Sequence, residues 1–93
     1  MKRIFKYNLK TLDEQRLKLP KGSKILSVTE QYNEIILYAM VDDDVTETET
    51  YSIIIHGTGH IVTKAQNYEF IDTVKLMDGQ LMFHLFYKYI ESK

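Results

Sequence analysis

Two histidines bracket a glycine-containing turn, and their imidazoles are the side chains in this sequence best suited to chemistry. His56 and His60 are separated by Gly57, Thr58 and Gly59. An imidazole donates and accepts hydrogen bonds and changes its charge near neutral pH. Glycine tolerates positive φ and lets a partner approach the backbone closely. These five residues, the histidine turn, are therefore our first candidate ligand- or partner-binding segment.

The histidine turn resembles parts of two known kinds of site without completing either. Two imidazoles with a carboxylate can bind zinc, but the sequence has no cysteine, no HExxH pattern and no third ligand at a fixed spacing. A phosphate-binding loop needs a longer glycine loop with Lys-Ser/Thr and a following helix, and these parts are missing. We therefore predict no metal site and no cofactor.

A second candidate segment is acidic and spans residues 42–49. It contains Asp42, Asp43 and Asp44, followed by Glu47 and Glu49. The carboxylates suggest calcium binding, but an EF-hand loop alternates its oxygen ligands around a central glycine, and this segment does not. A solvated loop with charges that protect strand edges is the alternative. Because binding residues cluster on loops at the ends of β scaffolds, we expect this acidic segment and the histidine turn to form one binding rim.

Neither catalysis nor nucleic-acid binding is favoured by the remaining residues. There is no nucleophile elbow, no triad and no acid pair of defined spacing, so we predict that the chain is not an enzyme. Single-stranded nucleic acid binds exposed aromatic rings in a basic groove. Alternation instead places Phe5 and Tyr7 together on an apolar face, opposite Lys6, which predicts that both rings belong to the core.

Length and composition predict a single cytosolic domain over residues 1–93. The chain has no cysteine, no apolar leader and no apolar run long enough to span a membrane. Its charge is uneven: residues 1–24 carry eight basic and two acidic side chains, whereas residues 25–93 carry four basic and eleven acidic ones. This asymmetry indicates an anionic partner or head-to-tail self-association, unless folding mixes the two segments on one surface.

The elements that must position these residues are β-strands, because the dominant hydrophobic period is two. Turn residues separate them at Pro20-Lys21-Gly22-Ser23, at Tyr32-Asn33 and at Asp78-Gly79, the last suited to a type I′ hairpin turn. We predict strands over residues 3–9, 11–19, 24–30, 34–41, 46–55, 69–77 and 80–90, and a short one over 60–62. Residues 81–90 and 11–17 leave a helical alternative open. The fold class is all-β, a small antiparallel β-sandwich or partly closed barrel of seven to eight strands.

The inward faces of these strands predict the core, and two strands predict self-association. The expected core residues are Phe5, Tyr7, Leu17, Leu26, Val28, Ile35, Leu37, Ile53, Ile55, Val74, Leu76, Leu81, Phe83 and Leu85. Residues 35–41 and 81–87 are apolar on both faces, which a small domain has little chain to cover. We therefore expect a homodimer or higher oligomer.

Several segments resemble a set of small bacteriophage and prophage proteins. These are Asp13-Glu14-Gln15, Leu19-Pro20-Lys21-Gly22, Ile25-Leu26-Ser27-Val28, the GTGH of residues 57–60, and the closing strand with Leu81, Phe83 and His84. The resemblance spans nearly the whole chain and implies a phage setting in the bacterial host cytoplasm, without an activity. It leads us to expect an accessory protein that blocks a host macromolecule, an antiviral-defence protein among them, or traps a signalling ligand. A virion structural or assembly protein is the alternative.

Overall fold

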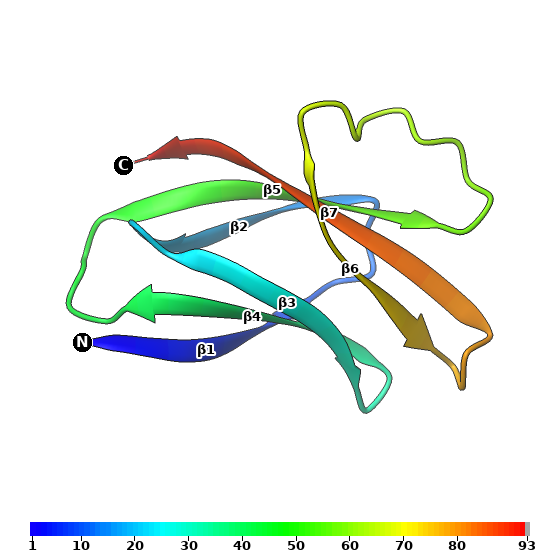
Figure 1. Cartoon of the computed structure of the whole chain (residues 1–93), viewed down its shortest axis with the longest axis horizontal. Coiled ribbons are helices and arrows are strands. Elements are labelled where there is room, and N and C mark those ends of the chain that lie inside the picture. The colour runs from blue at the N-terminus through cyan, green and yellow to red at the C-terminus, as the bar shows by residue number, and fades with distance from the viewer. Residues whose placement is uncertain (93) are drawn as a thin grey trace.

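The computed structural model describes residues 1–92, which form seven β-strands and no helix. In chain order the strands are β1 (Lys2–Leu9), β2 (Glu14–Pro20), β3 (Lys24–Gln31), β4 (Glu34–Asp42), β5 (Thr48–Gly57), β6 (Glu69–Leu76) and β7 (Leu81–Ser92) (Figure 1). The all-β prediction is confirmed. Residues 60–62 lie in the loop between β5 and β6, so the eighth strand is absent from the described part of the chain. No helix suited to crossing a membrane occurs within residues 1–92.

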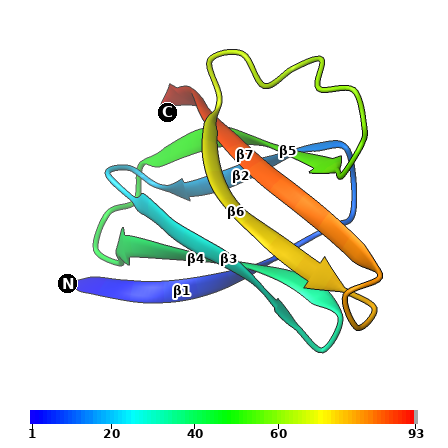
Figure 2. The ribbon, with the colours of Figure 1, turned by 45° about the vertical axis from the view of Figure 1, so that its right-hand side comes forward.

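The strands form two antiparallel sheets that pack face to face. One sheet has three strands in the order β1-β4-β3, and the other has four in the order β2-β5-β7-β6. The edge strands β3 and β6 lie side by side, which brings the two sheets together along one border (Figure 2). The other border, where β1 and β2 are the edge strands, is bridged by the crossover between them. The fold is therefore the sandwich form of the prediction.

One side chain explains why β2 begins at Glu14 rather than at residue 11. The chain leaves the three-stranded sheet after Leu9, and the backbone of Lys10 has no strand to pair with. Gln15 replaces that strand: its Oε1 accepts from the Lys10 amide at 3.1 Å, and its Nε2 donates to the Lys10 carbonyl at 2.6 Å. A primary amide can satisfy both groups because it carries a donor and an acceptor. The helical alternative for residues 11–17 is wrong, because the structure has no helix there and residues 14–17 belong to β2.

The core lies between the sheets and contains most of the residues predicted for it. Those buried are Val28, Ile35, Leu37, Ile53, Ile55, Val74, Leu76 and Leu85, and those packed partly buried against them are Tyr7, Leu17 and Phe83. The helical alternative for residues 81–90 is wrong, because they belong to β7, whose Leu85 is fully buried. Strand β4 is apolar on both faces because it is the central strand of its sheet, where neighbours on each side also cover the outward Ile36.

Three predicted core residues are exposed: Phe5, Leu26 and Leu81. Phe5 has the same parity as the buried Leu9 but lies on the edge strand β1. Leu26 is the extra residue of a β-bulge, since Ile25 pairs with Ala39 and Ser27 with Tyr38. The bulge turns Ile25 toward the core in its place. Leu81 is the first residue of β7, at the tip of a hairpin, where the sheet ends.

The turns predicted at Tyr32-Asn33 and at Asp78-Gly79 are both present, and each contains residues with positive φ. Tyr32 and Asn33 form a two-residue turn with φ of 53° and 62°, between the paired Gln31 and Glu34. The β6–β7 turn is longer than predicted. Its last pair is Leu76 with Leu81, so residues 77–80 form a four-residue loop. Positive φ extends over Met77, Asp78 and Gly79, rather than over a two-residue turn alone.

Candidate functional site

The histidine turn ends β5 and is folded back on itself. The His60 amide donates to the Gly57 carbonyl at 3.2 Å, and the Gly57 amide donates to His60 Nδ1 at 3.3 Å. That amide lies on the β5 edge facing β2, where Asp13 is the last residue to accept a backbone bond, from Ile55. The imidazole thus replaces a missing strand. Glycine is needed for two reasons: Gly59 has φ of +87°, and a Cβ on Gly57 would lie 2.8 Å from the His60 ring.

The space above Gly57 is therefore filled by the protein's own imidazole. Close approach of a partner to the Gly57 backbone therefore requires displacement of the His60 ring. At Gly59 a Cβ would meet no atom within 4 Å, so the backbone there is open. The accessible part of the turn is its tip.

The third histidine anchors the turn from the neighbouring strand. His84 lies opposite His56 in the β5–β7 register. Its Nε2 is 2.8 Å from Thr58 Oγ1, and its Nδ1 is 2.9 Å from Thr73 Oγ1. His84 therefore connects the turn to β6. Sequence reasoning did not assign this role, because the pairing of β5 with β7 is a long-range contact.

His56 has a different environment from the other two imidazoles. Its ring packs edge to face on Phe86, with 6.1 Å between ring centroids. Its Nε2 is buried and has no hydrogen-bond partner among residues 1–92. A buried polar atom without a partner is uncommon in folded proteins and is costly to keep. His56 is therefore the one imidazole whose present contacts do not account for its polar character.

A cavity of about 220 Å³ opens between the histidine turn and the start of β2. The loop of residues 58–68 forms one wall, and it is held on the outer face of the four-stranded sheet by Tyr68, whose hydroxyl is 2.8 Å from Ser52 Oγ. The residues that line the cavity are Asp13, Glu14, Ile54, Ile55, His56, His60, Ile61, Thr63 and Lys64. The predicted pair His56 and His60 thus lines one cavity.

Charged groups at the cavity's rim are paired with each other. Lys64 Nζ lies 2.9 Å from Glu14 Oε1. The hydrogen bond and charge of Lys64 lower the pKa of Glu14, and those of Glu14 raise the pKa of Lys64. Sequence reasoning missed these two residues as site members because fifty positions separate them. The one sequence feature that pointed to Glu14 was the Asp13-Glu14-Gln15 segment, which was singled out only because of the resemblance to the phage proteins.

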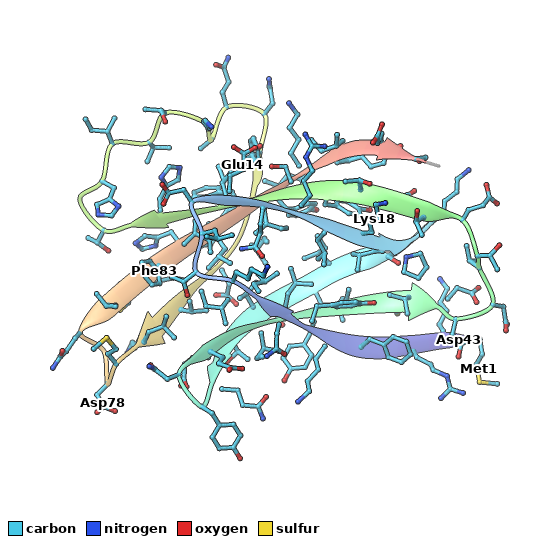
Figure 3. All side chains as sticks on the ribbon, turned by 180° about the vertical axis from the view of Figure 1, so that it is seen from behind. Met1, Glu14, Lys18, Asp43, Asp78 and Phe83 are labelled. Atoms are coloured by element: carbon cyan, nitrogen blue, oxygen red, sulfur yellow. The ribbon has the colours of Figure 1, made fainter. Side chains whose placement is uncertain are left out.

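The acidic segment meets the basic start of the chain instead of the histidine turn. The Met1 amine lies 3.0 Å from Asp42 and 3.3 Å from Asp43, and it also bonds Asp44; Arg3 Nε bonds Asp43 (Figure 3). The Asp44 amide and the Met1 amine lower the pKa of Asp42, and Arg3 lowers that of Asp43. Hydrogen bonds to Asp44 and Asp42 raise the pKa of the amine to about 10. Folding thus places opposite charges of the two segments together.

The two predicted binding segments are at opposite ends of β5, so the single binding rim is wrong. Strand β5 begins at Thr48, just after the acidic aspartates, and ends at Gly57 in the histidine turn (Figure 1). Ten extended residues span roughly 30 Å. Among residues 1–92, one cluster of three candidate metal ligands lies within 4.8 Å, and it consists of Asp42, Asp43 and Asp44. His56 and His60 are not part of it.

A third surface, which sequence reasoning did not assign to function, is formed by two hairpin tips. The Asn33 side chain of the β3–β4 turn accepts from the Met77 amide of the β6–β7 turn at 2.8 Å. A concavity of about 720 Å³ lies between the tips. Tyr32 is 90% exposed and Met77 is 51% exposed. We name this region, Tyr32, Asn33, Met77 and Asp78, the hairpin-tip surface; Figure 3 marks its position by Asp78.

Comparison with known proteins identifies the family and nothing further. No curated protein and no solved structure matches the chain significantly. The family description names neither an activity nor a phage. A family model described as "Domain of unknown function (DUF7352)" matches residues 1–93, and the chain belongs to this family.

Proposed function

We propose that this chain is a non-enzymatic accessory protein that binds and blocks a protein of a bacterial host. Its sequence resemblance to small phage and prophage proteins supports a phage setting and the host cytoplasm as the place of action. Antiviral-defence proteins are the class of target that fits such an accessory role. The binding surface that we assign to the target is the hairpin-tip surface.

The observation that carries this proposal is the conformation and exposure of Tyr32. Tyr32 has φ of 53°, which is an uncommon backbone conformation for a bulky side chain, and such conformations cluster at functional sites. Asparagine or glycine would suit this turn position better. The sequence instead presents an aromatic ring that is 90% exposed, next to a half-exposed methionine. Tyrosine and methionine are enriched where proteins contact each other, and tyrosine is one of the residue types enriched among binding hot spots.

The arrangement around Tyr32 is also suited to a protein partner because it is held in place. The bond from Met77 to Asn33 joins two hairpins from different sheets. A preformed surface loses little conformational entropy on binding. Glu30, Lys75 and Asp78 line the concavity and provide the polar rim that surrounds an interface centre.

Affinity capture from host lysate with a tagged chain tests the proposal. Tyr32→Asn removes the ring and places a residue that favours positive φ in the turn, so we expect unchanged or higher stability and loss of the captured protein. Val62→Asn is the matched control, since Val62 is 55% exposed in the loop of residues 58–68. Capture of the same protein by Tyr32→Asn at wild-type yield would show that binding occurs elsewhere.

A second candidate, capture of a small signalling ligand, is favoured by His56. Its buried Nε2 lies in a residue that lines the cavity of about 220 Å³. Native mass spectrometry of the chain purified from host cells tests it. His56→Phe keeps an aromatic ring and removes the unpartnered nitrogen, so it should raise stability and abolish the bound mass. A wild-type spectrum without an added mass contradicts this candidate.

The alternative of a virion structural or assembly protein is supported by exposed apolar side chains on the three-stranded sheet. Ile4 and Leu26 are both exposed there. A virion component should appear in purified particles by mass spectrometry, whereas an accessory inhibitor should not. Detection of the chain in particles at the abundance of capsid proteins would therefore overturn the accessory role.

A further inference from the structure

A pocket lined by tyrosines and glutamates lies at the end of the four-stranded sheet away from the histidine turn. It has a volume of about 650 Å³. Its walls include Tyr51, Tyr87 and Tyr89 with Glu49 and Glu69, and Ser23 of the β2–β3 turn faces them. We name this region the tyrosine pocket. It is distinct from the hairpin-tip surface and from the cavity beside His56.

Strand pairing places the three rings on one face of the sheet. Tyr51 pairs with Tyr89 in the β5–β7 register, and Tyr87 is two residues from Tyr89 on the same strand. Side chains two residues apart share a face. The rings contact edge to face, with centroids 6.0 Å apart for Tyr51 and Tyr87 and 5.9 Å apart for Tyr51 and Tyr89. The rings therefore form a fixed aromatic wall.

The hydroxyl groups of two tyrosines orient the two carboxylates. Tyr51 Oη donates to Glu49 Oε2 at 2.7 Å, and Tyr87 Oη donates to Glu69 Oε2 at 2.6 Å. Each bond uses one oxygen, and a carboxylate can accept at both. Two negative charges thus stand beside three aromatic rings.

Burial and the two carboxylates both disfavour ionisation of the pocket's tyrosines. Burial, followed by the hydrogen bond and charge of Glu49, raises the pKa of Tyr51. The hydrogen bond to Glu69, followed by burial, raises the pKa of Tyr87. Lys88 also borders the pocket, but alternation turns its ammonium to the outer face, where it lies 5.8 Å from the centroid of Tyr68. Burial disfavours any charge, so the part of these shifts that favours a cation is the part that comes from Glu49 and Glu69.

We propose that the tyrosine pocket binds an organic cation of the alkylammonium class. Aromatic faces attract such cations through their quadrupole, and desolvation strengthens the attraction. The carboxylates add charge complementarity, and the volume is within the range of small-ligand pockets. Tyr89 is 48% exposed and provides the most accessible ring of the pocket. This site is independent of the proposed protein partner.

NMR titration of the labelled chain tests the proposal with three cations and one neutral control. Choline and spermidine represent free cations, and a short peptide with one Nε-trimethyllysine represents a protein side chain. The control is 3,3-dimethylbutan-1-ol, which has the shape of choline without its charge. We expect saturable shifts confined to the tyrosine pocket for at least one cation, and the tightest of the three identifies the source. Equal binding of the neutral alcohol, or no saturable shift with any cation, would overturn the proposal.

Two variant pairs separate cation binding from general effects on the fold. Tyr89→Leu removes an aromatic face, whereas Tyr89→Phe keeps it; we expect roughly 3- to 10-fold weaker binding for the first and little change for the second. Glu69→Gln should weaken binding, whereas Glu91→Gln, with the same charge change at a position where the sheet pairs with Thr50, should not. Equal affinities within both pairs would refute the site. Because Tyr32→Asn leaves this pocket intact, failure here and failure of the protein-binding proposal are distinguishable.

Discussion

Gln15 supports the crossover from β1 to β2 through a pair of hydrogen bonds that only a primary amide provides. Gln15→Glu keeps the size but replaces the donor with a second acceptor, which then faces the Lys10 carbonyl. We expect the free energy of unfolding to fall by about 1–2 kcal/mol, because a backbone acceptor loses its partner. Urea denaturation measures the change. Gln66→Glu, in the exposed loop, is the control, and an equal loss in both variants would contradict the assignment.

The aspartates at the end of β4 make the free energy of unfolding depend on pH in the acidic range, which we call the acid limb of the stability curve. Contacts in the folded state lower the pKa of Asp42 and Asp43 below their unfolded values. A group with a lowered folded pKa contributes stability above its unfolded pKa, near 3.9, and loses that contribution as the pH falls through the folded value. We therefore expect Asp43→Asn to reduce stability at neutral pH and to flatten the acid limb of the stability curve. Thermal melts across acidic pH measure this.

The N-terminal amine gives the opposite dependence at the alkaline limb. Its pKa is raised from 8.0 to about 10, so its contribution is complete below 8.0 and is lost as the pH rises through about 10. The ion pairs behind both limbs are between exposed groups, so added salt should reduce the change in stability with pH at each limb. A melting temperature that is independent of salt at both limbs would contradict these ion pairs.

At the scale of the element, the bulge in β3 reverses the roles that alternation predicts for two neighbours. Ile25 packs against the core, whereas Leu26 is exposed. We expect Ile25→Ala to lower the free energy of unfolding by about 2 kcal/mol and Leu26→Ala to lower it by less than about 1 kcal/mol. Chemical denaturation of the two variants measures the difference. A larger loss for Leu26→Ala than for Ile25→Ala would contradict the bulge and support the register that alternation in the sequence indicates.

This bulge shows what limits prediction from the sequence. Alternation is a local signal, and it located the strands, the turns at Tyr32 and Asp78, and most of the core. An inserted residue changes the facing of a strand without changing composition, so Leu26 was placed inward. The candidate site depended even more on long-range pairing. Sheet order, which periodicity does not encode, determines three of its features. These are the His60 ring at the β5 edge, the ion pair of Lys64 with Glu14, and the pocket shared by the tyrosines of β5 and β7.

At the scale of the whole molecule, folding disperses the charge asymmetry of the sequence. The basic first strand lies beside β4, so Arg3 and the amine meet the acidic segment at the same edge. The asymmetry therefore does not by itself require an anionic partner. What remains uneven is apolar exposure. On the four-stranded sheet the loop of residues 58–68 and Phe70 cover Ile54 and Phe86, whereas the three-stranded sheet has no such loop in the described part of the chain.

The outer face of the three-stranded sheet is thus the surface where self-association would occur. Ile4 of β1 pairs with Met40 of β4 and is 62% exposed, and Leu26, which is also exposed, lies on β3 at the other side of β4. Contiguous exposed apolar side chains usually mark an interface, and a symmetric dimer is its commonest form.

We expect light scattering to show a dimer at high micromolar concentration. Ile4→Lys should yield a folded monomer whose melting temperature does not depend on protein concentration, whereas that of the dimeric wild type should rise with concentration. Val62→Lys adds the same charge in the loop of residues 58–68 and should leave the dimer intact. A monomeric wild type, or equal dissociation by both variants, would mean that this face is solvated in the free protein.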